Sequence, residues 1–499
     1  MGTVLKSSLV NLAATFVSML AGFAVSILNA RLLGPEGSGL AAFALWFAAS
    51  LSALADRGMP QVLLRSLGAS GSQPRTEWQA IARTAFSLFS GPVAAVGLAT
   101  AAYGLWVWHD EGREPGLFWA MTLLLFLLYA LSAFSTAAAR GRGNFRETAL
   151  STVAGSLLQL PFIVAGALFF GAAGAIAGMA VRFVPQALRL RRYVRFAAPP
   201  RPESLTPDMR RHARQMWLSD MIDVILVTRI ELVLLGLLFS TTEMGYFAAA
   251  AVFAGLVGQL ALQLSPSLVV GFSRPGMTED MQRTLFTQAM RLTALAVFPI
   301  GFGGAAIVPH LIPLVFGADF APAGTAAALL LLSSAIGGIA VVPWTYLAAT
   351  GGSGSLLRIM AGSAVTTVGF LAAAIWLAGL NGAALARILV EALTLTLLVN
   401  ALAHRDGPVM PLATLIRTAL AAGLCGLTAW ATARALPGWP GVIAAIAAAI
   451  PAYLAGLRLF GLVTAGDART LLGFRAVRRL PGPLKSVLAS LLRLVARRR

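Results

Sequence analysis

Apolar residues follow one another in long runs along the whole chain, and short segments rich in Gly, Pro or Arg separate these runs. Each run is roughly 18 to 25 residues long, the length that a helix needs to cross a bilayer core of about 30 Å. These breaks divide the sequence into about fourteen predicted membrane helices. The predicted helices lie at 8–33, 38–57, 82–108, 117–139, 148–170, 173–190, 215–239, 243–270, 288–316, 322–350, 356–379, 381–402, 410–434 and 440–461. The pattern therefore predicts an all-α polytopic membrane protein.

The composition excludes a water-soluble enzyme. Of the 499 residues, 58% are hydrophobic and 11% are charged, whereas a soluble domain has about 25% charged residues. The single cysteine, Cys425, lies in an apolar run and allows neither an intrachain disulfide nor a Cys-based metal cluster. The four histidines show no metal-ligand spacing, so we expect no metal site and no cofactor.

The net charge of +19 is unevenly distributed between the predicted loops. One set of alternate loops contains most of the Arg and Lys residues, while the other set holds only Arg31, Arg113 and Arg434. Cytoplasmic loops are rich in basic residues, so this asymmetry predicts an even number of crossings with both termini in the cytoplasm. The sequence contains no basic patch interleaved with aromatic residues, which would be the pattern of a nucleic-acid-binding surface.

An internal repeat runs through about residues 1–405 of the chain. Gly39 and Gly245 are 206 positions apart, and Gly174 and Gly382 are 208 positions apart. Each copy contains six predicted helices. An even number of crossings gives both copies the same orientation, so we expect a pseudo-two-fold axis along the membrane normal and a substrate path between the copies.

These observations define four predicted regions. They are a six-helix bundle at 1–205, a second six-helix bundle at 206–405, two additional membrane helices at 406–462 and a basic tail at 463–499. In the tail, apolar residues recur at helical spacing from Leu484 onward between Arg and Lys residues. This pattern favours a helix lying on an anionic cytoplasmic leaflet over a nucleic-acid-binding segment.

Arginines at membrane depth are candidates for binding an anionic substrate, because a charge there is costly unless it faces a cavity or a partner. The candidates are Arg182, Arg229 and Arg387, since guanidinium groups bind pyrophosphate oxygens in bidentate geometry. We expect these three to line a shared cavity. Arg57 and Arg65 could bind phosphate at the cytoplasmic mouth. The alternatives are snorkelling for Arg182, an intrahelical ion pair with Glu391 for Arg387, and simple membrane anchoring for Arg57 and Arg65.

Carboxylates at similar depth are candidates for coupling transport to a proton or Na⁺. A rotation of about 100° per residue places Asp220, Asp223 and Glu231 on one face of the helix predicted at 215–239. Asp56 and Glu391 complete this set. In the alternative interpretation, Asp220 and Asp223 lie at the aqueous end of the helix and Glu231 pairs with an Arg of another helix.

Five passages resemble the polysaccharide-transport proteins of the multidrug/oligosaccharidyl-lipid/polysaccharide exporter superfamily. They are Asn29 to Gly39, Leu54 to Arg65, Ala139 to Phe145, Arg229 to Gly236 and the turn Glu243 to Tyr246. The resemblance extends over about residues 5 to 400. The family often has Asp where Glu231 stands, so the carboxylate is kept with a longer reach.

The resemblance implies a V-shaped pair of six-helix bundles that opens alternately to each side of the bacterial inner membrane. The implied activity is the flipping of a polyprenyl-pyrophosphate-linked oligosaccharide to the outer leaflet, in association with other polysaccharide-assembly proteins. A cation-coupled multidrug exporter is the alternative within the superfamily. A glycan polymerase or glycosyltransferase is disfavoured, because its catalytic loop would need more room than the longest predicted outer loop, 109–116.

Overall fold

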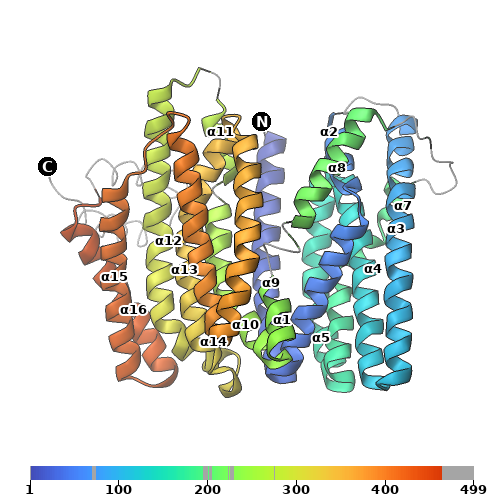
Figure 1. Cartoon of the computed structure of the whole chain (residues 1–499), viewed down its shortest axis with the longest axis horizontal. Coiled ribbons are helices and arrows are strands. Elements are labelled where there is room, and N and C mark those ends of the chain that lie inside the picture. Colours follow the sequence, from blue (N-terminus) through green and yellow to red (C-terminus); the bar gives the residue numbers. More distant parts are fainter. Residues whose placement is uncertain are drawn as a thin grey trace. The chain divides into compact units, whose positions relative to one another are not determined.

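The computed structural model describes residues 2–69, 75–194, 201, 205–222, 224, 230–263, 265–274 and 276–463. Every regular element in these ranges is a helix, and ten helices are long and apolar enough to cross a membrane. The prediction of an all-α polytopic membrane protein is confirmed. The chain divides into two compact units, residues 1–248 and 249–499 (Figure 1). The predicted bundle boundary at 205/206 and the total of fourteen crossings stay predictions.

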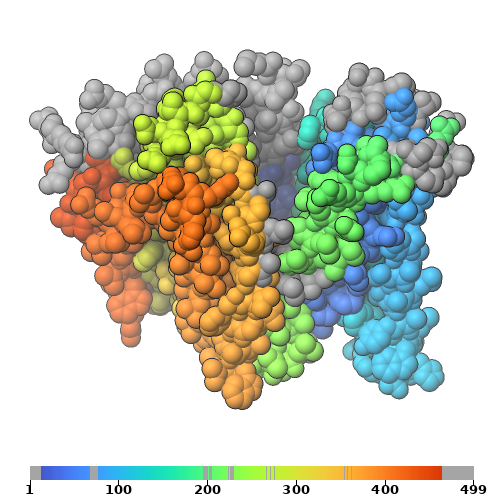
Figure 2. Space-filling view, turned by 45° about the horizontal axis from the view of Figure 1, so that its top comes forward, coloured from blue at the N-terminus to red at the C-terminus, as the bar shows by residue number. Residues whose placement is uncertain are grey.

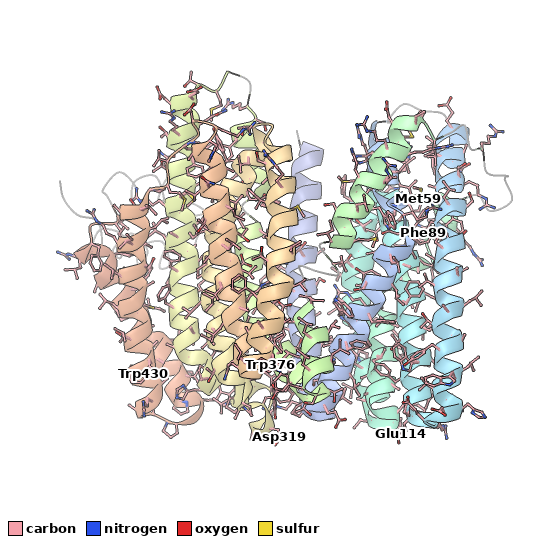
Figure 3. All side chains as sticks on the ribbon, viewed as in Figure 1. Met59, Phe89, Glu114, Asp319, Trp376 and Trp430 are labelled. Atoms are coloured by element: carbon pink, nitrogen blue, oxygen red, sulfur yellow. The ribbon has the colours of Figure 1, made fainter. Side chains whose placement is uncertain are left out.

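The first unit contains α1 (Gly2–Ala55), α2 (Met59–Ala69), α3 (Arg75–Asp110), α4 (Arg113–Gly141), α5 (Phe145–Val181), α6 (Val184–Ala187), α7 (Leu190–Tyr193), α8 (Pro207–Met221), α9 (Ile230–Leu238) and the start of α10 (Thr241–Leu262). Its core lies where α1, α3, α4 and α5 pack together, with Phe89, Phe126 and Phe134 fully buried. Figure 3 shows Met59 toward one end of this unit and Glu114 at the other.

The second unit contains the rest of α10, α11 (Ser265–Phe272), α12 (Glu279–Val315), the 3₁₀ helix η3 (Ala318–Phe320), α13 (Ala323–Ala349), α14 (Ser353–Ala403), α15 (Leu412–Ala435) and α16 (Gly438–Leu459). Phe286, Val342 and Leu398 are buried in a core formed by α12, α13 and α14. The pair α15 and α16 packs against α12 and matches the two additional helices expected near 410–434 and 440–461.

Three of the long helices change direction inside their length, at the places where the sequence predicts breaks between membrane helices. In α5 the break falls at Phe170 and Gly171, and a methyl group added at Gly174 would overlap the carbonyl group of Gly166. Residues eight positions apart therefore lie against each other, so α5 consists of two antiparallel segments. The same arrangement occurs in α14, and α1 breaks at Gly34.

The breaks in α5 and α14 share one backbone conformation. Phe170 and Gly171 have φ/ψ values of −135°/17° and 55°/−138°. Ala378 and Gly379, 208 positions later, have values of −141°/18° and 52°/−132°. Glycine is suited to the positive φ at the second position of each break. This agreement supports the proposed repeat, because the offset equals that between Gly174 and Gly382.

A second pair of repeat-related glycines lies in direct contact within the first unit. A methyl group at Gly39 in α1 would overlap the carbonyl oxygen of Thr241 in α10, and one at Gly245 would overlap the carbonyl oxygen of Pro35. Pro35 and Thr241 are themselves 206 positions apart. Each helix thus offers the same surface to the other, as in an isologous contact around a two-fold axis. The two helices approach backbone to backbone because neither glycine has a side chain.

Candidate functional site

Arg182 lies directly after α5 in a polar cluster of the first unit. Its Nη2 donates a hydrogen bond of 2.8 Å to Oγ of Ser18 in α1, and its guanidinium carbon lies 5.9 Å from the centre of the Phe183 ring. The Ser156 hydroxyl donates to the same Ser18 oxygen over 3.3 Å. Among the described residues, no carboxylate forms an ion pair with Arg182, so one serine hydroxyl is its hydrogen-bond partner. The guanidinium group retains donors for an anion.

Nothing in the sequence pattern singles out the groups around Arg182. Ser18 and Ser156 are small hydroxyl residues in predicted helices that contain other serines. A methyl group added at Gly155 would overlap the Arg182 carbonyl oxygen. This close packing fixes the backbone from which the guanidinium group extends. Polar residues in two neighbouring helices could have indicated this cluster. The sequence pattern does not show which helices are neighbours, because that depends on the fold.

The turn between α1 and α2 forms the second group of candidate residues. Oδ1 of Asp56 accepts a hydrogen bond of 2.7 Å from the Gly58 backbone amide, and Arg57 has φ 53°, in the left-handed region that disfavours non-glycine residues. Asp56 lies just beyond the membrane-spanning part of α1, and burial raises its pKa to about 6, with a smaller contribution from the negative charge of Asp220. The turn thus holds a carboxyl group that takes up a proton near neutral pH.

α8 packs directly onto this turn. Nε1 of Trp217 donates hydrogen bonds to the carbonyl oxygens of Ala53 (2.9 Å) and Leu54 (3.2 Å). Nε2 of Gln61 donates a hydrogen bond of 3.3 Å to Oδ2 of Asp220. The structure therefore brings two predicted carboxylates, Asp56 and Asp220, to one contact between the α1–α2 turn and α8.

The two arginines expected at the cytoplasmic mouth have exposed side chains. Arg57 lies in the turn itself, and Arg65 lies in α2. Both positions leave the guanidinium groups accessible to phosphate. They are equally accessible as surface anchors, so the two interpretations of these residues both stay predictions.

Arg387 and Glu391 form an ion pair within α14 of the second unit. Nε of Arg387 lies 3.6 Å from Oε1 of Glu391, and both side chains are 24% exposed. The carboxylate rests above Gly337 of α13, where an added methyl group would come within 2.8 Å of Oε2. The intrahelical pair that was the alternative interpretation of these two residues is present, while their roles in cargo binding and ion coupling stay predictions.

The remaining candidates lie around the start of α9. Glu231 is in the first turn of α9 and is only 2% exposed. Arg229 and Asp223 lie outside the described residues. Within the stretch predicted as one helix, 215–239, the structure describes the end of α8 and the whole of α9. The shared face for three carboxylates, which assumed continuous helical rotation, stays a prediction, and no group of His, Cys, Asp or Glu in the described part of the chain could hold a metal ion.

Comparisons with known proteins concern the family and the fold of the chain. Residues 27–324 match the family model described as "Polysaccharide biosynthesis protein". The chain also superimposes on lipid II flippase MurJ in an inward closed conformation, with a TM-score of 0.74 at 14% identity over 93% of this chain and 100% of that chain. An inward-facing multidrug resistance MATE family transporter of the MOP superfamily gives a TM-score of 0.59 at 16% identity over 80% of this chain and 98% of that chain. No curated protein sequence matched the chain.

Proposed function

Because the chain belongs to the polysaccharide biosynthesis protein family and has the fold of the MurJ flippase and the MATE transporters, we propose that it flips a polyprenyl-pyrophosphate-linked oligosaccharide from the cytoplasmic to the outer leaflet. The protein would act by alternating access and without covalent chemistry. The proposed location is the bacterial inner membrane, with both termini in the cytoplasm. Membrane lipid and other polysaccharide-assembly proteins are its proposed partners.

The observation that carries this proposal is the environment of Arg182. A part-buried guanidinium group, with one serine hydroxyl among the described residues as its hydrogen-bond partner, can form two further parallel bonds to a phosphate. A cationic drug would be repelled by the same group. Arg182 therefore favours an anionic cargo over the substrates of a cation-coupled multidrug exporter, which is the second candidate function.

Arg387 has a different proposed role from the one expected. Its ion pair with Glu391 reduces the positive charge that it can offer to a pyrophosphate, so we assign it a weaker contribution than that of Arg182. The proposed role of Arg229 rests on its sequence position alone. The proton or Na⁺ coupling assigned to Asp56, Asp220, Asp223, Glu231 and Glu391 also stays a prediction.

The proposal is tested by replacing Arg182 and measuring transport of a lipid-linked oligosaccharide in reconstituted vesicles. Arg182→Met keeps an unbranched side chain but removes every donor, so we expect about a 10- to 100-fold slower rate, because hydrogen bonds to charged groups contribute about 1.5–3 kcal/mol. Arg182→Lys should restore part of the rate, since an ammonium group keeps the charge but loses the bidentate geometry.

Arg417→Met is the matched control, because Arg417 is exposed on α15 and has no proposed contact with cargo. It should leave transport unchanged. If the wild type transports the lipid-linked oligosaccharide and Arg182→Met transports it at the same rate, Arg182 is not part of the cargo site. A wild-type protein that moves cationic drugs and no lipid-linked sugar would instead favour the second candidate function.

A further inference from the structure

α8 has two faces with different environments. One face contacts the α1–α2 turn through Trp217 and Asp220, and Ala213 on this side is 3% exposed. A methyl group added at Gly58 would overlap the carbonyl oxygen of Ala213, so helix and turn touch backbone to backbone. These contacts fix the rotation of α8 about its own axis. They leave exposed the adjacent face of α8, which begins about 20° beyond Trp217, and Figure 2 shows α8 on the surface.

The exposed face of α8 carries three arginines around one leucine. With about 100° of rotation per residue, Arg210, Arg214, Leu218 and Arg211 fall within an arc of about 100°. All four side chains are exposed, and Leu218 is 49% exposed. Asp208, the exposed acidic residue of α8, lies in the first turn about 60° outside this arc. The face is therefore strongly positive with an apolar centre.

A fourth arginine extends this surface beyond α8. Arg57 is exposed, and it precedes Gly58, whose backbone touches Ala213. Next to it, Leu54 at the end of α1 is 43% exposed. We call the surface formed by Arg57, Arg210, Arg211, Arg214 and Leu218 the α8 basic face.

The level of this face relative to the membrane follows from the helices that it joins. α8 is too polar to cross a bilayer. Its first eight residues, Pro207 to Arg214, contain three arginines, one histidine and one aspartate. It packs where the membrane-spanning part of α1 ends at Ala55. The α8 basic face therefore lies at the depth where lipid phosphates meet acyl chains.

We propose that the α8 basic face binds the phosphate of an anionic phospholipid of the surrounding leaflet, with Leu218 against the acyl chains. Basic side chains at a membrane surface are attracted to anionic lipids, and an apolar residue among them buries itself at the headgroup boundary. Lipid is favoured over the transported pyrophosphate because the arginines spread along two turns of one helix instead of converging on a point. α8 is also the first element of the second predicted bundle, so bound lipid would fix the chain where it enters that bundle.

Lipid binding can be measured without transport, which separates this proposal from the proposed function. The full-length protein in a neutral detergent is titrated with phosphatidylglycerol or phosphatidylcholine, and bound lipid is counted by native mass spectrometry. The variant R211Q/R214Q should bind phosphatidylglycerol about 25-fold more weakly, because each arginine near an anionic surface contributes about 1 kcal/mol and 1.4 kcal/mol is tenfold. Phosphatidylcholine binding should not change.

A second double variant, R358Q/R417Q, is the matched control. It removes the same charge from exposed positions on α14 and α15, and it should keep the wild-type affinity for phosphatidylglycerol. Thermal unfolding of both variants checks that each is folded. Equal losses in the two variants, or no loss in R211Q/R214Q, would overturn the proposal. It would also be overturned if a polyprenyl pyrophosphate displaced phosphatidylglycerol from the wild type and lost affinity in R211Q/R214Q, because the face would then belong to the cargo site.

Discussion

The contact between Gly39 and Gly245 gives the sharpest prediction about the fold. In Gly245→Ala, the new methyl group would overlap the carbonyl oxygen of Pro35. The overlapping atom belongs to the backbone, so no rotamer change relieves the overlap and α1 and α10 must separate. Overpacking of this kind costs about 1–3 kcal/mol, while alanine at a helix interior stabilises by up to about 1 kcal/mol relative to glycine.

Gly255→Ala provides the control, because it lies in the same helix and an added methyl group there meets no atom within 4 Å. The two alanine variants should differ in their free energy of unfolding by about 1–3 kcal/mol, measured by denaturant titration of the purified protein. Gly39→Ala should behave like Gly245→Ala, with Gly22→Ala as its control, since Gly22 also has open space around it.

The double variant G39A/G245A tests whether the two glycines share one contact. A single separation of α1 from α10 relieves both overlaps, so the double variant should lose about as much stability as either single variant. Mutations at unrelated sites would instead add. Additive losses, or a Gly245→Ala variant as stable as Gly255→Ala, would refute the backbone contact between the two helices.

Two further predictions concern charged groups. Burial raises the pKa of Asp56 to about 6, so its stabilising contribution is complete below the unfolded pKa of about 4 and is lost as the pH rises through 6. Asp56→Asn should therefore remove a pH dependence of stability between pH 4 and 6 and stabilise the protein at pH 7 by up to about 3 kcal/mol, and an unchanged pH profile would contradict this. For the ion pair of Arg387 and Glu391, a double-mutant cycle with Arg387→Met and Glu391→Gln should give a coupling energy of about 0.5–1 kcal/mol in stability, whereas zero coupling would mean that the contact contributes nothing.

Much of the fold could be predicted from the sequence, because a membrane imposes simple rules on helix length. The breaks near Gly34, Gly171 and Gly379 follow from the clusters of glycine, proline and charged residues in the sequence, and the structure places the changes of direction there. The repeat was visible because glycine is required wherever backbones approach closely, as at Gly39 and Gly245.

The candidate site was less predictable, because it depends on which helices touch. The spacing of Arg387 and Glu391 identified an ion pair, since both residues belong to one helix. The hydroxyl groups around Arg182 come from α1 and from the first segment of α5, and nothing in a linear pattern pairs those segments. The docking of Asp220 beside Asp56 likewise requires α8 to fold back onto the α1–α2 turn.

The flippase assignment is tested most directly by the position of lipid-linked oligosaccharide in cells that lack the protein. Inside-out and right-side-out membrane vesicles from the deletion strain would be probed with an impermeant glycan-modifying reagent. We expect lipid-linked oligosaccharide to accumulate on the cytoplasmic face. The wild-type chain should restore its appearance on the outer face, while Arg182→Met should restore it poorly. An unchanged distribution between the two faces in the deletion strain, with no other transporter able to substitute, would contradict the flippase assignment.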